Sequence, residues 1–372
     1  MAGNGRDRIT RRGFLEAGSA ALVGTTLLAD AKQAGAAVEN AATEKASAGA
    51  ETGKIALEEH FAVPELFGSS LAMNKDLALP RIRERILDTG GGRIAEMDRG
   101  EVELAILSFV APGIQAIPNP ARAIEAARRT NDYLAEQVAK NPKRLRGFAA
   151  LPLQEPQAAA QELTRCVKEL GLCGTLVNGF SQVGEADSAV YYDLPQYRAF
   201  WATVQDLDVP FYLHPRAPLP SRRQAYEGHP WMVGSAWGFA AETSIHALRL
   251  MGSGLFDEYP KLKIILGHLG EGIPFNIWRV DHRVQLNSAK PKTRSPIGQY
   301  LRENFYITTS GNFRTQALMD VISEVGSDRV MYSADYPFED MVEAKDWFDG
   351  TALSAPDRAR IARGNAQKLF RL

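Results

Sequence analysis

The chain lacks an excess of charge of either sign, since its 372 residues include 43 Lys and Arg against 44 Asp and Glu. Binding to a nucleic-acid backbone or to an anionic lipid surface needs concentrated positive charge, so the composition argues against a nucleic-acid partner. Cysteine is also scarce: Cys166 and Cys173 form neither a CxxC pair nor a paired framework. A disulfide scaffold and a thiolate metal site are therefore not supported, and we expect two buried free thiols.

A short basic and apolar leader opens the chain. The pair Arg11 and Arg12 is followed by Phe14 and Leu15, and then by an apolar run over residues 17–29. That run is too short and too rich in Ala and Gly to span a bilayer. The segment resembles a twin-arginine export signal, an address that a receptor reads on proteins exported already folded.

Small residues around position 30, at 29–31 or alternatively at 34–36, provide a cleavage site after this leader. We therefore predict a signal peptide over residues 1–31, a flexible low-complexity linker over residues 32–53 and a single catalytic domain over residues 54–372. The mature chain is expected in the periplasm or outside the cell, with no membrane insertion. A leader that does not function would leave the protein in the cytoplasm.

From residue 54 onward, short runs rich in β-branched and apolar residues alternate with segments of helical periodicity, which is typical of repeated βα units. Eight strands are predicted, at residues 55–61, 102–109, 145–153, 172–180, 209–215, 263–270, 305–311 and 330–338. Helices are predicted between them, at residues 120–139, 156–170, 197–207, 240–251 and 315–325. This pattern favours an α/β fold of the (β/α)8 TIM barrel type. The alternative is an open doubly wound sheet, which is weakened because no glycine-rich phosphate loop follows the first strand.

Polar side chains stand at the carboxyl ends of the predicted strands, where barrels of this kind carry their catalytic groups. They are Glu58, His60, His214, His268 and Asp335. Glu58 and His60 lie two residues apart on one strand, so their side chains point to the same face. Two imidazoles and two carboxylates can surround one divalent cation, and a nitrogen and oxygen ligand set favours Mn, Zn or Fe. We therefore predict Glu58, His60, His214 and Asp335 as metal ligands.

The residues around these ligands lead to three further expectations. Glu59 should point outward and serve no catalytic purpose. The predicted fourth strand has no lysine, the residue whose carbamylated form bridges two metals in some barrel hydrolases, so a single metal is expected. His268 is then free for acid–base or orienting work, and a hydrogen-bonded chain from His268 through Glu271 to Arg279 is geometrically reasonable. The alternative for Glu271 and Arg279 is an ordinary surface pair on a helix.

Four segments, taken together, resemble the amidohydrolase-superfamily decarboxylases of hydroxylated benzoates, and the similarity extends over residues 53–372. They are GKIALEEHF at 53–61, DVPFYLHPR at 208–216, GHLGE at 267–271 and SADYPFE at 333–339. Within that group the chain is most similar to the γ-resorcylate (2,6-dihydroxybenzoate) decarboxylases. This resemblance implies a barrel of the metal-dependent amidohydrolase type that holds one divalent ion, Mn²⁺ before Zn²⁺, with no organic cofactor. It also implies a homodimer or homotetramer and a small aromatic carboxylate as substrate.

The reaction implied by the resemblance is the non-oxidative, reversible decarboxylation of an ortho-hydroxylated benzoate, such as 2,6-dihydroxybenzoate to resorcinol and CO2. Asp335 would be the proton donor to the ring carbon, with His268 as second choice. Glu271 would orient His268, and Arg279 would help to hold the carboxylate and the departing CO2. The alternative function is a metal-dependent hydrolase of a lactone or amide on the same barrel. A non-catalytic binding protein is disfavoured because all four predicted ligands are present.

Overall fold

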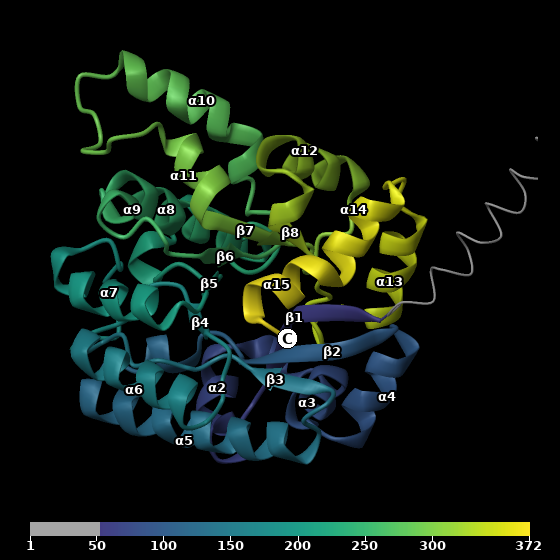
Figure 1. Ribbon diagram of the computed structural model, residues 1–372. Coiled ribbons are helices and arrows are strands. Elements are labelled where there is room, and N and C mark those ends of the chain that lie inside the picture. Colours follow the sequence, from purple (N-terminus) through teal and green to yellow (C-terminus); the bar gives the residue numbers. More distant parts are fainter. Residues whose placement is uncertain (1–52) are drawn as a thin grey trace, which may run out of the picture. The chain divides into compact units, whose positions relative to one another are not determined.

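Eight parallel strands form the centre of the fold in the computed structural model, which describes residues 53–372 (Figure 1). They are β1 (Lys54–Phe61), β2 (Val102–Phe109), β3 (Leu145–Gly147), β4 (Thr175–Asn178), β5 (Phe211–His214), β6 (Ile264–Leu266), β7 (Phe305–Thr308) and β8 (Val330–Met331). Neighbouring strands pair in chain order within two groups, β1 to β3 and β4 to β8. A parallel bridge between Ala149 and Thr175 links the two groups on one side. On the other side the His60 amide donates to the carbonyl of Tyr336, in the segment that follows β8, at 2.7 Å.

Helices cover the outside of this ring of strands, as the predicted βα alternation requires (Figure 1). The main crossover helices are α5 (Pro120–Lys140), α6 (Pro156–Lys168), α7 (Arg198–Leu207), α8 (Gly238–Gly252), α10 (Ile273–Leu286), α11 (Ile297–Asn304) and α12 (Thr315–Val325). The others are α2 (Phe67–Met73), α3 (Pro80–Leu87), α4 (Gly91–Arg99), α9 (Leu255–Glu258), α13 (Met341–Gly350), α14 (Ala355–Ala359) and α15 (Asn365–Phe370). None of the helices in the described part of the chain is long and apolar enough to cross a bilayer.

The helix boundaries follow local sequence signals. At the start of α5 the Asn119 side chain accepts a hydrogen bond from the Arg122 amide, and Pro120 occupies the first turn, where its missing N–H costs nothing. Asp340 caps α13 in the same way, through the amides of Val342 and Glu343. All five predicted helices begin and end within a few residues of their predicted boundaries.

Two layers of apolar side chains stabilise the barrel. One cluster fills its interior with side chains from six of the described strands: Ile55, Leu57, Leu104, Ile106, Leu176, Tyr212, Ile265 and Met331. The larger cluster lies between the strands and the surrounding helices. This arrangement confirms the (β/α)8 architecture, because a closed barrel has a filled interior and an outer seam under its helices.

The first strand departs from simple alternation at a β-bulge. Ala56 pairs with Ala105 and Glu59 pairs with Leu107, so β1 uses one residue more than β2 over this stretch. Bulges of this kind re-aim side chains, often beside active sites. Here the bulge allows Leu57 to fill the barrel interior while the next residue, Glu58, also lies inside, at the rim.

Several predicted strands extend too far. The sixth was expected over residues 263–270 but ends at Leu266, and the eighth was expected over residues 330–338 but ends at Met331. His268 and Asp335 therefore lie in the turns that follow these strands. The long segment after β5 contains only short 3-10 turns before α8 begins at Gly238. The predicted signal peptide and nearly all of the predicted linker lie outside the described residues.

Candidate metal centre

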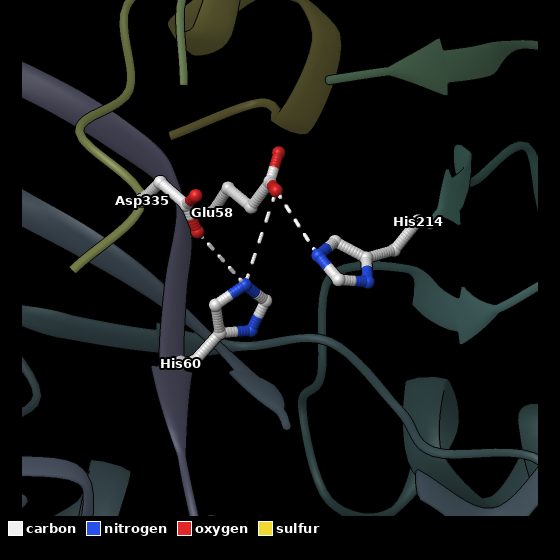
Figure 2. Close-up of side chains that lie close together, drawn as sticks. All are labelled: Glu58, His60, His214 and Asp335. Carbon is white, nitrogen blue, oxygen red and sulfur yellow. Dashed lines mark ion pairs between the residues drawn. The ribbon is translucent and has the colours of Figure 1, made fainter. Parts of the chain in front are cut away.

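Four of the predicted residues meet at the carboxyl ends of the strands. Glu58 and His60 come from β1, His214 is the last residue of β5, and Asp335 follows β8. Figure 2 shows their side chains pointing toward one another. One ligand atom from each lies within 4.8 Å of all the others, and this is the cluster with metal-binding geometry found among the described residues.

The contacts inside this cluster are short without being hydrogen bonds. The Nε2 atom of His214 lies 3.1 Å from Oε1 of Glu58, and Nε2 of His60 lies 3.2 Å from Oδ1 of Asp335. Yet Glu58 Oε1 and His60 Nε2 are buried and have no hydrogen-bond partner among the described residues. Buried polar atoms are rarely left in this state, because losing water without a replacement partner costs free energy. Lone pairs that face a common point are satisfied by a cation, so these residues fit a divalent metal ion.

Neighbouring polar groups hold the ligands in place. The Oγ atom of Ser108 lies 3.0 Å from Nδ1 of His60, which leaves Nε2 free to face the cluster. The second oxygen of Glu58, Oε2, accepts hydrogen bonds from the hydroxyls of Tyr212 and Ser310. These contacts fix the directions of His60 and Glu58 before a metal arrives.

Sequence reasoning missed these supporting residues, although one of them carried a usable signal. Tyr212 and His214 lie two apart on β5, so the alternation that paired Glu58 with His60 also places Tyr212 on the ligand side. No comparable signal identifies Ser108 or Ser310, since a single serine on a strand is commonplace.

His268 and Glu271 form a second polar group beside the ligands. The Nδ1 atom of His268 is 2.7 Å from Oε1 of Glu271, while its Nε2 atom is 3.5 Å from Oδ2 of Asp335. His268, Glu271 and Asp335 all have positive φ angles, of 50°, 56° and 76°. Non-glycine residues hold such conformations only where the surrounding structure enforces them, and they gather at functional sites.

The charges of this cluster shift the pKa values of its members. Burial alone would raise the pKa of Glu58, but the charge of His268 and the close imidazoles of His214 and His60 hold it well below its usual value. Burial alone would lower the pKa of His60, but Asp335 and Glu58 raise it to about 9. The pKa of His268 is likewise raised, because the charges of Glu58 and Glu271 outweigh the effect of burial. A bound cation would compete with these protons, so metal binding is coupled to proton release.

Arg279 does not join the predicted hydrogen-bonded chain. It lies exposed on α10, and no hydrogen bond or ion pair connects it to Glu271 or to any other residue in the described range. The helix begins at Ile273 and buries Ile273 and Ile277. At about 100° per residue, Arg279 is turned roughly 200° from Ile277 and so faces solvent. The expected contact between Glu271 and Arg279 is wrong for the single chain.

Glu59 faces away from the ligands, as expected from strand alternation. It is also fully buried. Its carboxylate accepts hydrogen bonds from the amides of Ala334 and Tyr336 at 3.0 and 3.1 Å, and from the Ser333 hydroxyl at 3.1 Å. Burial raises the pKa of Glu59 to about 7. The outside of a barrel strand is covered by the rest of the fold, so a side chain that points outward can still be buried.

Comparison with known proteins places this site in a family. Residues 64–372 match the amidohydrolase family. The chain is a member of that family. It is 57% identical over 322 residues to the γ-resorcylate decarboxylase of Polaromonas sp. strain JS666, a match that covers 86% of this chain and 99% of that one.

Two solved structures of this amidohydrolase group show that the similarity extends to the fold. A 2,6-dihydroxybenzoate decarboxylase in complex with 2,6-dihydroxybenzoate is 54% identical, with a TM-score of 0.83 over 87% of this chain and 100% of that one. The dihydroxybenzoic acid decarboxylase of Polaromonas sp. JS666, with bound manganese and the inhibitor 2-nitroresorcinol, is 56% identical, also with a TM-score of 0.83, over 87% and 98%. The predicted family and fold are therefore confirmed, and the expectation of one divalent metal agrees with the manganese in that relative.

Proposed function

We propose that this amidohydrolase decarboxylates 2,6-dihydroxybenzoate to resorcinol and CO2, reversibly and without oxidation, with Mn²⁺ at the site of Glu58, His60, His214 and Asp335. The observation that carries the proposal is the convergence of four metal-ligating side chains beside the His268 and Glu271 pair, two of whose buried ligand atoms, Glu58 Oε1 and His60 Nε2, have no hydrogen-bond partner among the described residues. The relatives named γ-resorcylate decarboxylase support the choice of substrate. A bound cation would add positive charge at this buried site and would favour binding of a small anion.

The order of bond changes follows from the stability of the intermediates. Direct loss of CO2 from an aryl carboxylate would leave an aryl anion, which is prohibitively unstable. The ring carbon bearing the carboxylate must therefore be protonated first, and two ortho hydroxyl groups make that carbon electron-rich. The bond to the carboxylate then breaks, its electron pair returns to the ring, and CO2 leaves. When bound, the metal ion supplies a charge that orients the carboxylate and phenolate and stabilises the developing charge.

Asp335 is placed to serve both the metal and the proton. Its Oδ1 atom faces His60 among the ligands, while its Oδ2 atom faces Nε2 of His268 at 3.5 Å. One oxygen can bind a cation while the other carries a proton to the ring carbon. His268 is the nearby group that can return a proton to Asp335, and Glu271 holds its imidazole in the required direction. Gly311 leaves room next to this pair, since a Cβ there would lie 3.0 Å from Asp335 Oδ2.

Isotope incorporation tests this order of events. In D2O the product should be resorcinol with one deuterium at C2, the carbon that carried the carboxylate. The reverse reaction at high bicarbonate should convert resorcinol to 2,6-dihydroxybenzoate. Release of a ring-opened acid from a lactone, with no reaction of dihydroxybenzoate, would instead assign the metal-dependent hydrolase.

We also propose that two or more copies of the chain associate through α10. Phe275, Trp278 and Leu286 recur at helical spacing on this helix, and their side chains are 79%, 71% and 64% exposed. Trp237, 58% exposed near the start of α8, lines an apolar groove of about 390 Å³ between α8 and α10. A stripe of large apolar side chains is usually covered by a partner, and a second copy of the same stripe is the simplest cover.

This association places Arg279 at the interface, since it lies on the same exposed side of α10. Light scattering after size-exclusion chromatography should give the mass of a dimer or tetramer. The double variant Phe275→Asp, Trp278→Asp should reduce it to the mass of one chain. A monomeric wild-type protein would contradict the proposal.

We propose, finally, that the leader directs export. The pair Arg11 and Arg12 before an apolar segment supports this, and so does the match to the Polaromonas relative, which covers 99% of that chain but 86% of this one. Cell fractionation should find the protein outside the cytoplasm, and the double variant Arg11→Lys, Arg12→Lys should retain it inside. Cytoplasmic protein from the unchanged sequence would reject the export signal.

A further inference from the structure

The join between the first and last strands uses side chains in place of a regular ladder. In the described residues β1 pairs with β2 but not with β8. Instead, the Ser333 hydroxyl oxygen accepts hydrogen bonds from the amides of Leu57 and Glu58, at 3.2 and 2.7 Å. Two successive amides reach one acceptor because the β1 bulge turns both in the same direction. The segment that carries Asp335 therefore depends for its position on these side-chain contacts as well as on the backbone hydrogen bond from the His60 amide to the Tyr336 carbonyl.

Glu59 makes the other half of this join. Its Oε1 atom accepts from the Ser333 hydroxyl and from the Ala334 amide, and its Oε2 atom accepts from the Tyr336 amide. The two amides belong to the residues immediately before and after Asp335. One carboxylate thus holds the peptide groups on both sides of a predicted metal ligand.

The conformation held in this way is one that Asp335 does not adopt by preference. Its φ angle is 76°, in the left-handed region that non-glycine residues occupy rarely. A residue in such a conformation keeps it only while its neighbours prevent relaxation. Fixing the amides at Ala334 and Tyr336 prevents this relaxation, and it directs the two Asp335 oxygens toward His60 and His268.

A buried arginine also contacts both β1 and the segment that carries Asp335. The Arg93 guanidinium donates to the His60 carbonyl oxygen at 2.5 Å, and its centre lies 4.8 Å from the centroid of the Tyr336 ring. Arg93 is fully buried, as Glu59 is, and its positive charge favours the ionised form of the Glu59 carboxylate. The buried polar side chains of Ser333, Glu59 and Arg93 therefore support β1 and the Asp335 segment together.

We propose that Glu59 is a positioning residue that sets Asp335 as metal ligand and proton donor by holding the amides of Ala334 and Tyr336. The inference rests on the proposed function for the role of Asp335 in catalysis, but its effect on metal binding does not depend on which substrate the enzyme uses. Loss of the hydrogen bonds from these two amides to the Glu59 carboxylate should weaken Mn²⁺ binding and slow the proton transfer, while the affinity for substrate changes little.

The test substitutes Glu59→Gln, which keeps the size of the side chain but replaces one acceptor oxygen with an NH2 group that cannot accept from an amide. The Mn²⁺ dissociation constant, measured by competition with a chelating dye, should rise about 10- to 100-fold, the usual effect of losing a group that orients a metal ligand. With Mn²⁺ saturating, kcat for 2,6-dihydroxybenzoate should fall at least about tenfold while KM stays within about twofold.

A matched control separates positioning from a general loss of stability. Glu162 is another buried glutamate, which pairs with Arg165 and Asn131 far from the metal centre. Glu162→Gln should lower the unfolding temperature and leave both Mn²⁺ affinity and kcat unchanged. If Glu59→Gln does not fold, Glu59→Asp replaces it, since the shorter carboxylate keeps its charge but cannot reach both amides, and both quantities should again fall.

The outcomes distinguish this inference from the proposed function. Weak Mn²⁺ binding by the folded Glu59 variant, in a protein that does not decarboxylate dihydroxybenzoate, would reject the substrate and keep the positioning role. Mn²⁺ affinity and kcat equal to those of the wild type in a folded Glu59 variant would overturn the inference, whatever the substrate.

Discussion

The hydroxyl of Tyr212 should control the metal affinity of the site, although it is not a ligand. It donates to Oε2 of Glu58 and lies 2.7 Å from Oγ1 of Thr308. Tyr212→Phe removes both contacts and leaves Glu58 Oε2 with the Ser310 hydroxyl alone at 2.5 Å. The ring itself still fills the barrel interior, so the packing is kept.

The size of the effect on stability and metal affinity follows from the negative charge of the acceptor, the Glu58 carboxylate. A hydrogen bond to a charged group contributes about 1.5–3 kcal/mol, against about 1 kcal/mol for a neutral pair. Orienting groups behind a ligand typically change metal affinity by about 10- to 100-fold. Tyr212→Phe should therefore destabilise the metal-free protein by about 2 kcal/mol and weaken Mn²⁺ binding by at least about tenfold.

The same substitution elsewhere provides the control. Tyr192 is also fully buried, and its hydroxyl lies 2.9 Å from the neutral Ser181 hydroxyl, away from the ligands. Tyr192→Phe should destabilise the protein by about 1 kcal/mol and leave Mn²⁺ binding as it is. Titration with Mn²⁺ against a chelating dye, together with urea unfolding, measures both quantities. Equal Mn²⁺ affinity in the two variants would refute the reasoning.

Four other predictions concern single residues. Asp335→Asn keeps the shape of the side chain but removes the acid, so kcat should fall by about 10²–10⁴-fold in a steady-state assay; an unchanged rate would remove Asp335 from its role. His214→Ala should empty the metal site, as measured by the metal content of the dialysed protein, and full occupancy would exclude His214 as a ligand. Gly311→Ala would place a Cβ 3.0 Å from Asp335 Oδ2 and 3.3 Å from His268 at a φ of 60°, so activity should drop sharply while Mn²⁺ stays bound; normal turnover would show that the pair tolerates crowding. Burial, with the nearby charge of Arg249, lowers the pKa of His246 to about 3. Below about pH 6.5 the unfolded state therefore binds a proton at His246, whereas the folded state does not bind it until about pH 3. His246 therefore costs about 1.4 kcal/mol of stability per pH unit between about pH 6 and pH 3, and the stability difference between wild type and His246→Gln should shrink at that rate in urea unfolding; a difference independent of pH would contradict this.

The ligand set was accessible to sequence reasoning because two simple periodicities govern it. Strand alternation put Glu58 and His60 on one face, and barrel topology brought His214 and Asp335 to the same rim. The bulge in β1 was not accessible, because it arises from pairing with β2, which the sequence of β1 alone does not show. The register shift lies between Ala56 and Glu59, and the side chains of Glu58 and His60 still point to the same side, so the bulge did not affect the prediction.

The errors come from treating one chain segment without its neighbours. Spacing along α10 suggested that Arg279 could reach Glu271, but the turn at Glu271 and Gly272 has positive φ angles and sets the rotation of the whole helix. Alternation placed Glu59 correctly on the far side of β1, but only the fold shows that the backbone around Asp335 covers it. Positive φ angles at His268 and Asp335 likewise depend on tertiary contacts, which is why both strands were predicted too long.

The most direct test of the proposed function is ultraviolet-monitored turnover of 2,6-dihydroxybenzoate by the full-length protein, with and without Mn²⁺, alongside 2,3-dihydroxybenzoate and salicylate. The proposed function predicts conversion of 2,6-dihydroxybenzoate to resorcinol, lost on chelation and restored by Mn²⁺. No conversion of any of the three compounds by protein shown to contain the metal would contradict it and would direct the next assay to lactones.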